Sequence, residues 1–173
     1  MDSEHLRAIQ APIKERYRAE PEAALITLKA SGSIDDQEGV SCSVETGRAL
    51  VRAGLHPATG GDGMLVCSGD MLLQALVACA GVTLRAVATA KGIELRGGSV
   101  NAEGDLDFRG TLGVDREAPV GFKNIRLRFD LDVDASPEDI AALQKLTERY
   151  CVVYQTLASG VKPEIEFKTV SHR

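Results

Sequence analysis

Cysteine is the residue type in this 173-residue chain that offers the most chemistry, because thiolates act as nucleophiles, bind metals and form disulfides. Four cysteines occur, separated by 25, 12 and 72 residues: Cys42, Cys67, Cys79 and Cys151. They form no Cys-x-x-Cys motif, and the histidines at positions 5, 56 and 172 are too scattered to complete a zinc set. We therefore expect no metal and no other cofactor. Cys42, in a predicted strand, and Cys67, before an apolar helix, are interpreted as packing residues.

Cys79 is predicted to lie in the middle of a long apolar helix. The helix is expected to begin with Ser68 as its N-cap and to end near Lys91, where Gly92 supplies the stop. Apolar side chains surround it almost completely, so we expect a central helix that is buried on most sides. Burial disfavours a thiolate, and Cys79 is therefore either core filler or a nucleophile with a positive charge beside it.

Cys151 lies among apolar and aromatic residues in a later helical stretch. Ser136, Pro137 and Asp139 make a strong helix start, with serine at the cap, proline at the first helical position and an acid for the capping box. Helical spacing of apolar residues continues to position 159. The pattern predicts either one long helix or two helices with a break near Arg149.

The rest of the chain is predicted to form strands around these helices. Alternation of apolar and polar residues predicts strands over 23–29, 40–46, about 48–55, 100–112, 124–133 and 162–167. A short amphipathic helix is predicted at 4–19. Strands grouped before and between helices favour an α+β fold with mainly antiparallel sheets on a few buried helices. We expect an N-terminal arm, residues 1–22, and one domain, residues 23–173.

Composition and charge exclude several classes of function. A net charge of −5 and only seven aromatic residues give no basic, aromatic footprint for nucleic acid. The longest apolar stretch, 71–84, is shorter than a membrane span and is interrupted by Gln74 and Thr83. The acidic N-terminus is unlike a signal peptide. We expect a cytoplasmic protein without nucleic-acid or membrane partners, whose cysteines remain thiols.

Two segments resemble the cysteine motifs of the OsmC/Ohr family of osmotically inducible and organic hydroperoxide resistance proteins. The first begins with Asp70, continues through two leucines and an Ala-Leu pair to Cys79, and ends at Thr83-Leu84. In the second, Cys151 is followed by an apolar pair and, shortly after, by Thr-Leu. Both motifs occur in the family's order, and the resemblance covers roughly residues 23–170. The chain is identified as a member of this family.

The resemblance implies an intertwined homodimer whose antiparallel sheets wrap around buried central helices. It also implies a thiol-dependent peroxidase that reduces organic hydroperoxides in oxidative or osmotic stress. Cys79 would attack the peroxide and become a sulfenic acid, Cys151 would condense with it to a disulfide, and an external dithiol such as a lipoyl group would restore both. The alternative is a non-catalytic dimer of this fold that binds a small hydrophobic ligand or a partner, with structural cysteines.

In the family, an arginine held by the acidic residue at the helix start activates the first cysteine. Asp70 is the acidic candidate here, but nine residues separate it from Cys79, which is half a turn round a helix and about 13 Å along it. It could act only through a long arginine or across the dimer. Arg52 is the candidate for that arginine, with Arg48 nearby as a second.

Both motifs depart from the family pattern. Gly69 precedes the acid, where a proline-acid pair is common. Many members have proline directly after the second cysteine, which fixes that cysteine at a helix start where the dipole favours thiolate, whereas this chain has Val152. Arg149 could instead lower the pKa of Cys151.

Overall fold

The computed structural model describes residues 32–33, 41–45, 50–113 and 115–167, together with single helical positions at 4, 8, 11 and 19. The predicted strand at 23–29 and most of the predicted helix at 4–19 lie outside the described residues. The division into an arm and a domain therefore stays a prediction.

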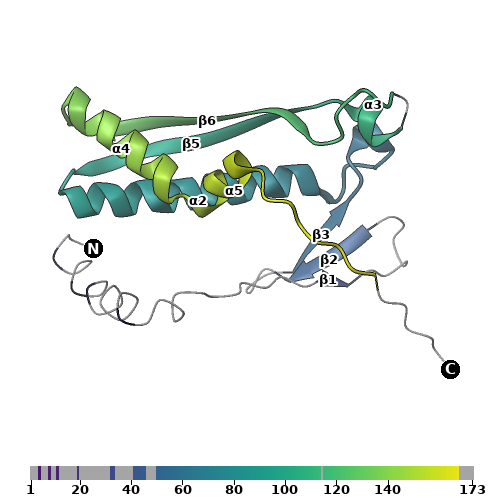
Figure 1. The fold of residues 1–173 in the computed structure, drawn as a ribbon, viewed down its shortest axis with the longest axis horizontal. Coiled ribbons are helices and arrows are strands. Elements are labelled where there is room, and N and C mark those ends of the chain that lie inside the picture. The colour runs from purple at the N-terminus through teal and green to yellow at the C-terminus, as the bar shows by residue number, and fades with distance from the viewer. Residues whose placement is uncertain are drawn as a thin grey trace.

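The described elements form two small sheets and several helices (Figure 1). In chain order they are β1 (Gly32–Ser33), β2 (Ser41–Glu45), β3 (Leu50–Gly54), the 3-10 turn η2 (Pro57–Thr59), β4 (Val66–Cys67), α2 (Ser68–Lys91), β5 (Leu95–Leu106), α3 (Phe108–Thr111), β6 (Phe122–Val133), α4 (Pro137–Tyr150) and α5 (Val152–Ser159). The first sheet has the order β1-β2-β3-β4, antiparallel except for β3 and β4, and the second is the antiparallel pair β5-β6. The α+β fold class is confirmed.

Helix α2 is the element against which β5, α4 and α5 pack. Its buried residues recur every four positions and so form one stripe: Leu76, Ala80, Leu84 and Ala88. The prediction that α2 is buried on most sides is wrong for the single chain, because Val82 is 73% exposed and no described element covers that side. Hydrophobicity all round the helix predicted burial but could not say which face this chain covers by itself.

The sequence predicted the C-terminal end of α2 correctly but placed its N-cap one residue too late. Cys67, not Ser68, is the N-cap residue, and no side chain caps the helix there, so Ser68 is the first helical residue. Gly92 ends the helix in the left-handed conformation, at φ 71°, as predicted. By length and composition α2 would suffice to cross a membrane, although the stretch 71–84 alone falls short. Core helices of water-soluble proteins meet the same criterion.

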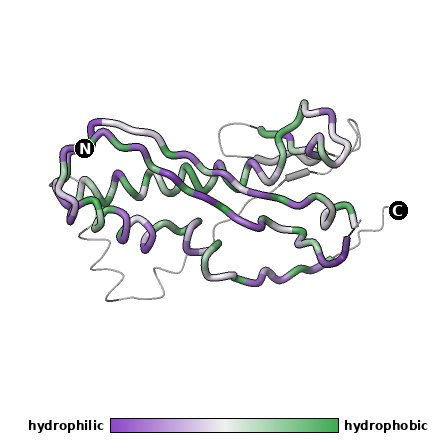
Figure 2. The backbone as a smooth tube through the Cα atoms, turned by 90° about the horizontal axis from the view of Figure 1, so that it is seen from above, coloured by the Kyte–Doolittle hydropathy of each residue, from purple (hydrophilic) through white to green (hydrophobic). Residues whose placement is uncertain are grey.

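The hairpin of β5 and β6 lies along α2 (Figure 1). Hydrophobic and hydrophilic residues are interspersed along its backbone (Figure 2). Ile125, Leu127 and Phe129 pack into the core, while the charged residues between them are exposed. The predicted strand at 100–112 is misplaced, because pairing with β6 carries β5 back through Gly97 and Gly98 to residue 95. Its far end instead forms α3, where the Gly110 N–H donates to the Asp107 carbonyl.

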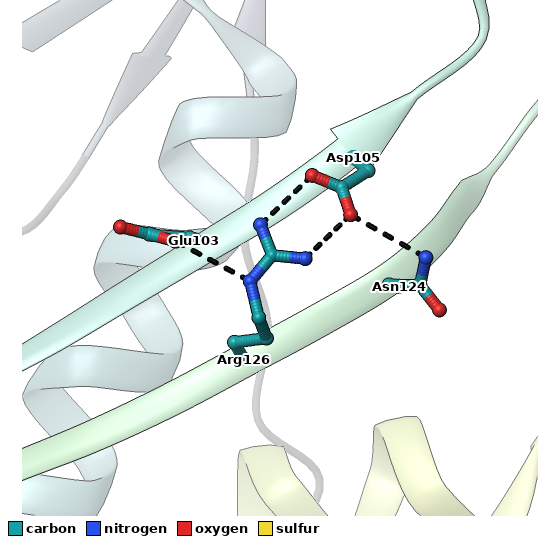
Figure 3. Close-up of polar contacts among 4 residues, drawn as sticks. All are labelled: Glu103, Asp105, Asn124 and Arg126. Carbon is teal, nitrogen blue, oxygen red and sulfur yellow. Dashed lines mark hydrogen bonds and ion pairs between the residues drawn. The ribbon is translucent and has the colours of Figure 1, made fainter.

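The outer face of this hairpin holds an ionic cluster (Figure 3). The Arg126 guanidinium donates to Asp105, at 2.8 Å for one of its two contacts, and to Glu103 at 3.3 Å. The hydrogen bond from Arg126 lowers the pKa of Asp105 from 3.8 to about 2, with a smaller contribution from Asn124. All of these side chains are exposed to solvent.

The helix start at Ser136 is confirmed. The Ser136 Oγ accepts a hydrogen bond from the Asp139 N–H at 3.1 Å, and Pro137 opens α4. The helical stretch is broken, since α4 ends at Tyr150 and α5 begins at Val152. The predicted final strand is wrong within the described chain, because residues 161–167 have no regular secondary structure and are exposed. An apolar alternation gives a strand only where a neighbouring edge is available to pair with it.

Candidate functional site

The structure brings Cys79 and Cys151 together from two elements that are 72 positions apart in the sequence. Cys79 lies halfway along α2 and is half-buried, while Cys151 is 1% exposed and occupies the junction of α4 and α5. Cys151 is the C-cap of α4 and the N-cap of α5, in an extended conformation with φ −73° and ψ 108°. Both residues are free thiols, and their side chains are in hydrogen-bonding contact.

The environment of Cys79 favours the thiolate. Burial is the largest single influence and raises the pKa, but four hydrogen bonds together outweigh it. In decreasing order they come from the Val153 N–H, the Cys151 thiol, the Val152 N–H and the Thr83 hydroxyl. The net result is a Cys79 pKa below the ordinary value of 9.0.

Cys151 is shifted in the opposite direction. Burial is the largest influence and raises its pKa above 9.0. The hydrogen bond from the Tyr154 N–H, next in size, lowers it, the hydrogen bond to Cys79 and the negative charge on Cys79 raise it, and a smaller hydrogen bond from the Val153 N–H lowers it. Cys79 is therefore the more acidic thiol of the pair, and Cys151 is the thiol that donates to it. A nucleophile and a second thiol in contact with it are the parts that disulfide formation requires.

One expectation about the activation of these thiols stays a prediction and one is wrong. The groups that lower the Cys79 pKa in the described part of the chain are backbone N–H groups, a hydroxyl and a thiol, so an activating cation, from this chain or from a second copy, stays a prediction. The Arg149 guanidinium lies over the Tyr150 ring, 5.6 Å from its centroid, and it is not among the groups that shift the Cys151 pKa, which is raised, not lowered. The absence of proline does not remove the helix start, since α5 begins at Val152.

Asp70 and Arg52 lie elsewhere in the chain. Asp70 is exposed in the first turn of α2 and borders a cavity of about 370 Å³ with His56 and Cys67. Arg52 lies in β3, opposite Ser43 of β2. Neither is among the groups that shift the Cys79 pKa. Their catalytic roles stay predictions.

The donors that surround Cys79 were not predicted from the sequence. Thr83 was detectable, because it lies one helical turn after Cys79 on the same face. The Val152 and Val153 N–H groups had no residue-type signal, since any residue except proline carries this donor. They are available because the helix breaks at Cys151, which the sequence placed only approximately.

An apolar cavity of about 330 Å³ lies between α2, β6, α4 and α5. Its lining includes Leu84, Phe129, Leu131, Leu143 and Tyr154. Tyr154 also joins this cavity to the thiol pair, because its backbone N–H is a donor to Cys151. The described residues contain no cluster of three or more histidine, cysteine or acidic side chains that could hold a metal.

Comparison with known proteins places this geometry in a family. The model of OsmC-like proteins matches residues 61–166, more than half of the chain and both cysteines of the pair. No curated protein matches the chain. The fold is that of several solved structures, to which the sequence identity is below 20%.

An OsmC-like protein from Mycoplasma pneumoniae is 19% identical, with a TM-score of 0.62 over 77% of this chain and 88% of that one. An OsmC-like protein of unknown function from Vibrio cholerae is 13% identical, with a TM-score of 0.58 over 75% and 94%. A protein from Legionella pneumophila, described as an organic hydroperoxide resistance protein OsmC and predicted redox protein, is 19% identical, with a TM-score of 0.59 over 78% and 90%. The chain belongs to the OsmC-like family.

Proposed function

We propose that this protein is a thiol-dependent peroxidase that reduces organic hydroperoxides. The observation that supports this most directly is the contact between Cys79 and Cys151, whose pKa values are shifted in opposite directions. A thiolate with a protonated thiol beside it is poised for attack on a peroxide and for resolution by the second sulfur. The apolar cavity beside the pair suits an apolar substrate.

The reaction proceeds in three balanced steps. The Cys79 thiolate attacks the terminal oxygen of the hydroperoxide ROOH, and the O–O bond breaks. The products are the Cys79 sulfenic acid and an alkoxide, which takes up a proton to give the alcohol ROH. The Cys151 sulfur then attacks the Cys79 sulfur and releases water, forming the disulfide. An external dithiol, such as a lipoyl group, reduces the disulfide and is itself oxidised.

The working unit in this proposal is a cytoplasmic homodimer. The exposed side of α2, where Val82 is 73% exposed, is an apolar surface that a second copy would cover. In this proposal Asp70 and Arg52 act across the dimer on the thiol pair of the second copy, since neither is among the groups that shift the Cys79 pKa within one chain.

Peroxidase activity is tested with cumene hydroperoxide and dihydrolipoamide. The wild type is expected to consume peroxide catalytically, and Cys79→Ser to reduce turnover to the blank rate. Cys151→Ser is expected to undergo one turnover and to accumulate a sulfenic acid at Cys79 that a dimedone probe traps. Cys67→Ser, a free thiol outside the pair, is the matched control and should retain activity.

The competing function is a non-catalytic dimer that binds a small hydrophobic ligand. Two dithiols, a lipoyl and a small one, are each tested with an alkyl and an aryl hydroperoxide. If the wild type turns over no faster than Cys79→Ser in all four assays, the non-catalytic function is favoured. Binding of an apolar dye would then identify the ligand site.

A further inference from the structure

The break between α4 and α5 changes the partners of particular backbone groups. In a continuous helix the Val152 N–H would donate to the Glu148 carbonyl, four residues earlier. The ψ of 108° at Cys151 turns the next peptide away, and no backbone hydrogen bond joins Val152 to Glu148 in the described chain. The Val152 and Val153 N–H groups instead lie within hydrogen-bonding reach of the Cys79 sulfur.

The Glu148 carbonyl, which does not accept from the Val152 N–H, accepts a hydrogen bond from a side chain. The Gln155 side-chain Nε2 donates to the Glu148 carbonyl oxygen at 2.7 Å. The Gln155 backbone N–H donates to the Cys151 carbonyl at 2.9 Å, within the first turn of α5. One residue therefore satisfies the end of α4 while it belongs to the start of α5. Its side chain supplies the hydrogen bond that the Val152 N–H would make in an unbroken helix.

Two arrangements thus compete for the same groups. If the Glu148 carbonyl lacked a side-chain donor, the Val152 N–H would be its nearest replacement, and making that bond would withdraw the N–H from Cys79. We propose that Gln155 is a positioning residue that stabilises the break and so holds the first turn of α5 against the Cys79 sulfur. The reaction that this thiolate performs rests on the proposed function, but its acidity does not.

Few other groups can account for the acidity of Cys79. Cys79 packs against the buried cluster of Leu76, Ala80 and Cys151, and the hairpin adds apolar side chains to the same cluster, Ala102 and Leu127 among them. From α2 the polar neighbour is Thr83, and from the α4–α5 junction the titratable neighbour is Cys151. Among the described groups that shift the Cys79 pKa, none carries a fixed charge.

The test is the pH profile of Cys79 alkylation by iodoacetamide, followed at the Cys79 peptide by mass spectrometry, because the rate follows the thiolate fraction. Gln155→Ala is expected to raise the midpoint by about half a pH unit, the size of one modest hydrogen bond. Gln155→Glu, similar in shape but unable to donate when ionised, is expected to raise it by at least as much. Gln144→Ala is the matched control, since Gln144 donates to the Glu148 side chain at 2.9 Å and not to its carbonyl. Its midpoint should equal that of the wild type.

The inference is overturned if both Gln155 variants retain the wild-type midpoint, or if Gln144→Ala shifts it as far as they do. Gln155 is exposed, so both variants are expected to fold, and their circular dichroism and melting temperature check this. The readout needs no peroxide. A protein that shows the expected shifts but no peroxidase activity would refute the proposed function and leave the role of Gln155 intact.

Discussion

The outer face of the β5–β6 hairpin and the thiol pair beneath it both lower the pKa of an acid, by different means. On the outer face, the charge and hydrogen bonds of Arg126 bring the pKa of Asp105 to about 2. At the thiol pair, Cys79 is stabilised by backbone N–H groups, a hydroxyl and a neighbouring thiol, without a fixed charge among them. The Asp105 side chain is 46% exposed on the outer face, whereas Cys79 packs against the buried cluster of Leu76, Ala80 and Cys151.

The difference shows that a full charge suits the stabilisation of an ionised acid at the surface, whereas hydrogen-bond dipoles suit it in the interior. In water a guanidinium is inexpensive to place, but its effect is screened and contributes little to folding. In the interior a buried cation would itself need compensation, whereas oriented N–H groups are already desolvated and fixed by the helix. The OsmC-like chain uses the first device for its surface and the second for its reactive thiol.

The largest difference in stability between the two regions should come from removing a side chain that packs against the thiol pair. Leu76 is 1% exposed and lies in the same cluster as Cys151, so Leu76→Ala is expected to reduce the free energy of unfolding by about 3 kcal/mol. Urea denaturation measures it. Arg128→Gln on the outer face is the control, and a loss there as large as at Leu76 would contradict the contrast between the two regions.

A smaller effect is expected from a single interior donor. Thr83→Val keeps the shape of the side chain but removes its hydrogen bond to Cys79, which should raise the alkylation midpoint by about 0.5 to 1 pH unit. Thr89→Val is the matched control on α2, because the Thr89 hydroxyl donates to the Arg85 carbonyl at 2.8 Å. Equal midpoints in the two variants would show that the hydroxyl at position 83 does not stabilise the thiolate.

The exposed acid should respond more weakly. The folded pKa of Asp105, about 2, lies below its ordinary 3.8, so its ion pair stabilises the fold above about pH 4 and loses this effect as the pH falls through 2. Asp105→Asn is expected to lower the melting temperature at pH 7 by no more than about 2 °C. At pH 2 the melting temperatures of the wild type and Asp105→Asn should be nearly equal, as calorimetry can check. A difference in melting temperature that grows as the pH falls would contradict the expected sign of the pKa shift.

Salt should separate the two devices without any substitution. Raising NaCl from 0.05 to 1 M is expected to move the Asp105 pKa, followed by NMR, back toward its ordinary value. The Cys79 alkylation midpoint should stay unchanged within about 0.2 pH unit, since N–H dipoles at contact distance are not screened. A rise of that midpoint with salt would mean that a cation, such as Arg52 of a second copy, also acts on the thiol.

The sequence predicted the elements whose signals are local. Ser136, Pro137 and Gly92 act within one turn of the chain, and the structure confirms all three. The alternation in β6 was equally secure because one face packs into the two buried clusters and the other meets water. The helix at 68–91 was predicted because its stop signal at Gly92 is local and its apolar residues lie close together along the chain.

Features that depend on distant partners were predicted less well. The start of β5 lies in glycines that show no alternation, and only pairing with β6 makes them a strand. The segment 161–167 alternates but has no strand partner among the described elements. At the site, the cysteines were recognisable by type, whereas the N–H donors of Val152 and Val153 depend on a backbone turn at Cys151 that side-chain identity does not encode.

The 72 positions between Cys79 and Cys151 give the proposed disulfide a thermodynamic role of its own. A cross-link that closes a loop of this length restricts the unfolded chain and, in the loop-entropy description, stabilises the fold by about 4 kcal/mol. By linkage, the folded protein stabilises the disulfide by the same amount relative to the unfolded chain. Each catalytic cycle would therefore alternate between a more and a less stable protein, and unfolding would be most accessible in the reduced state that awaits its substrate.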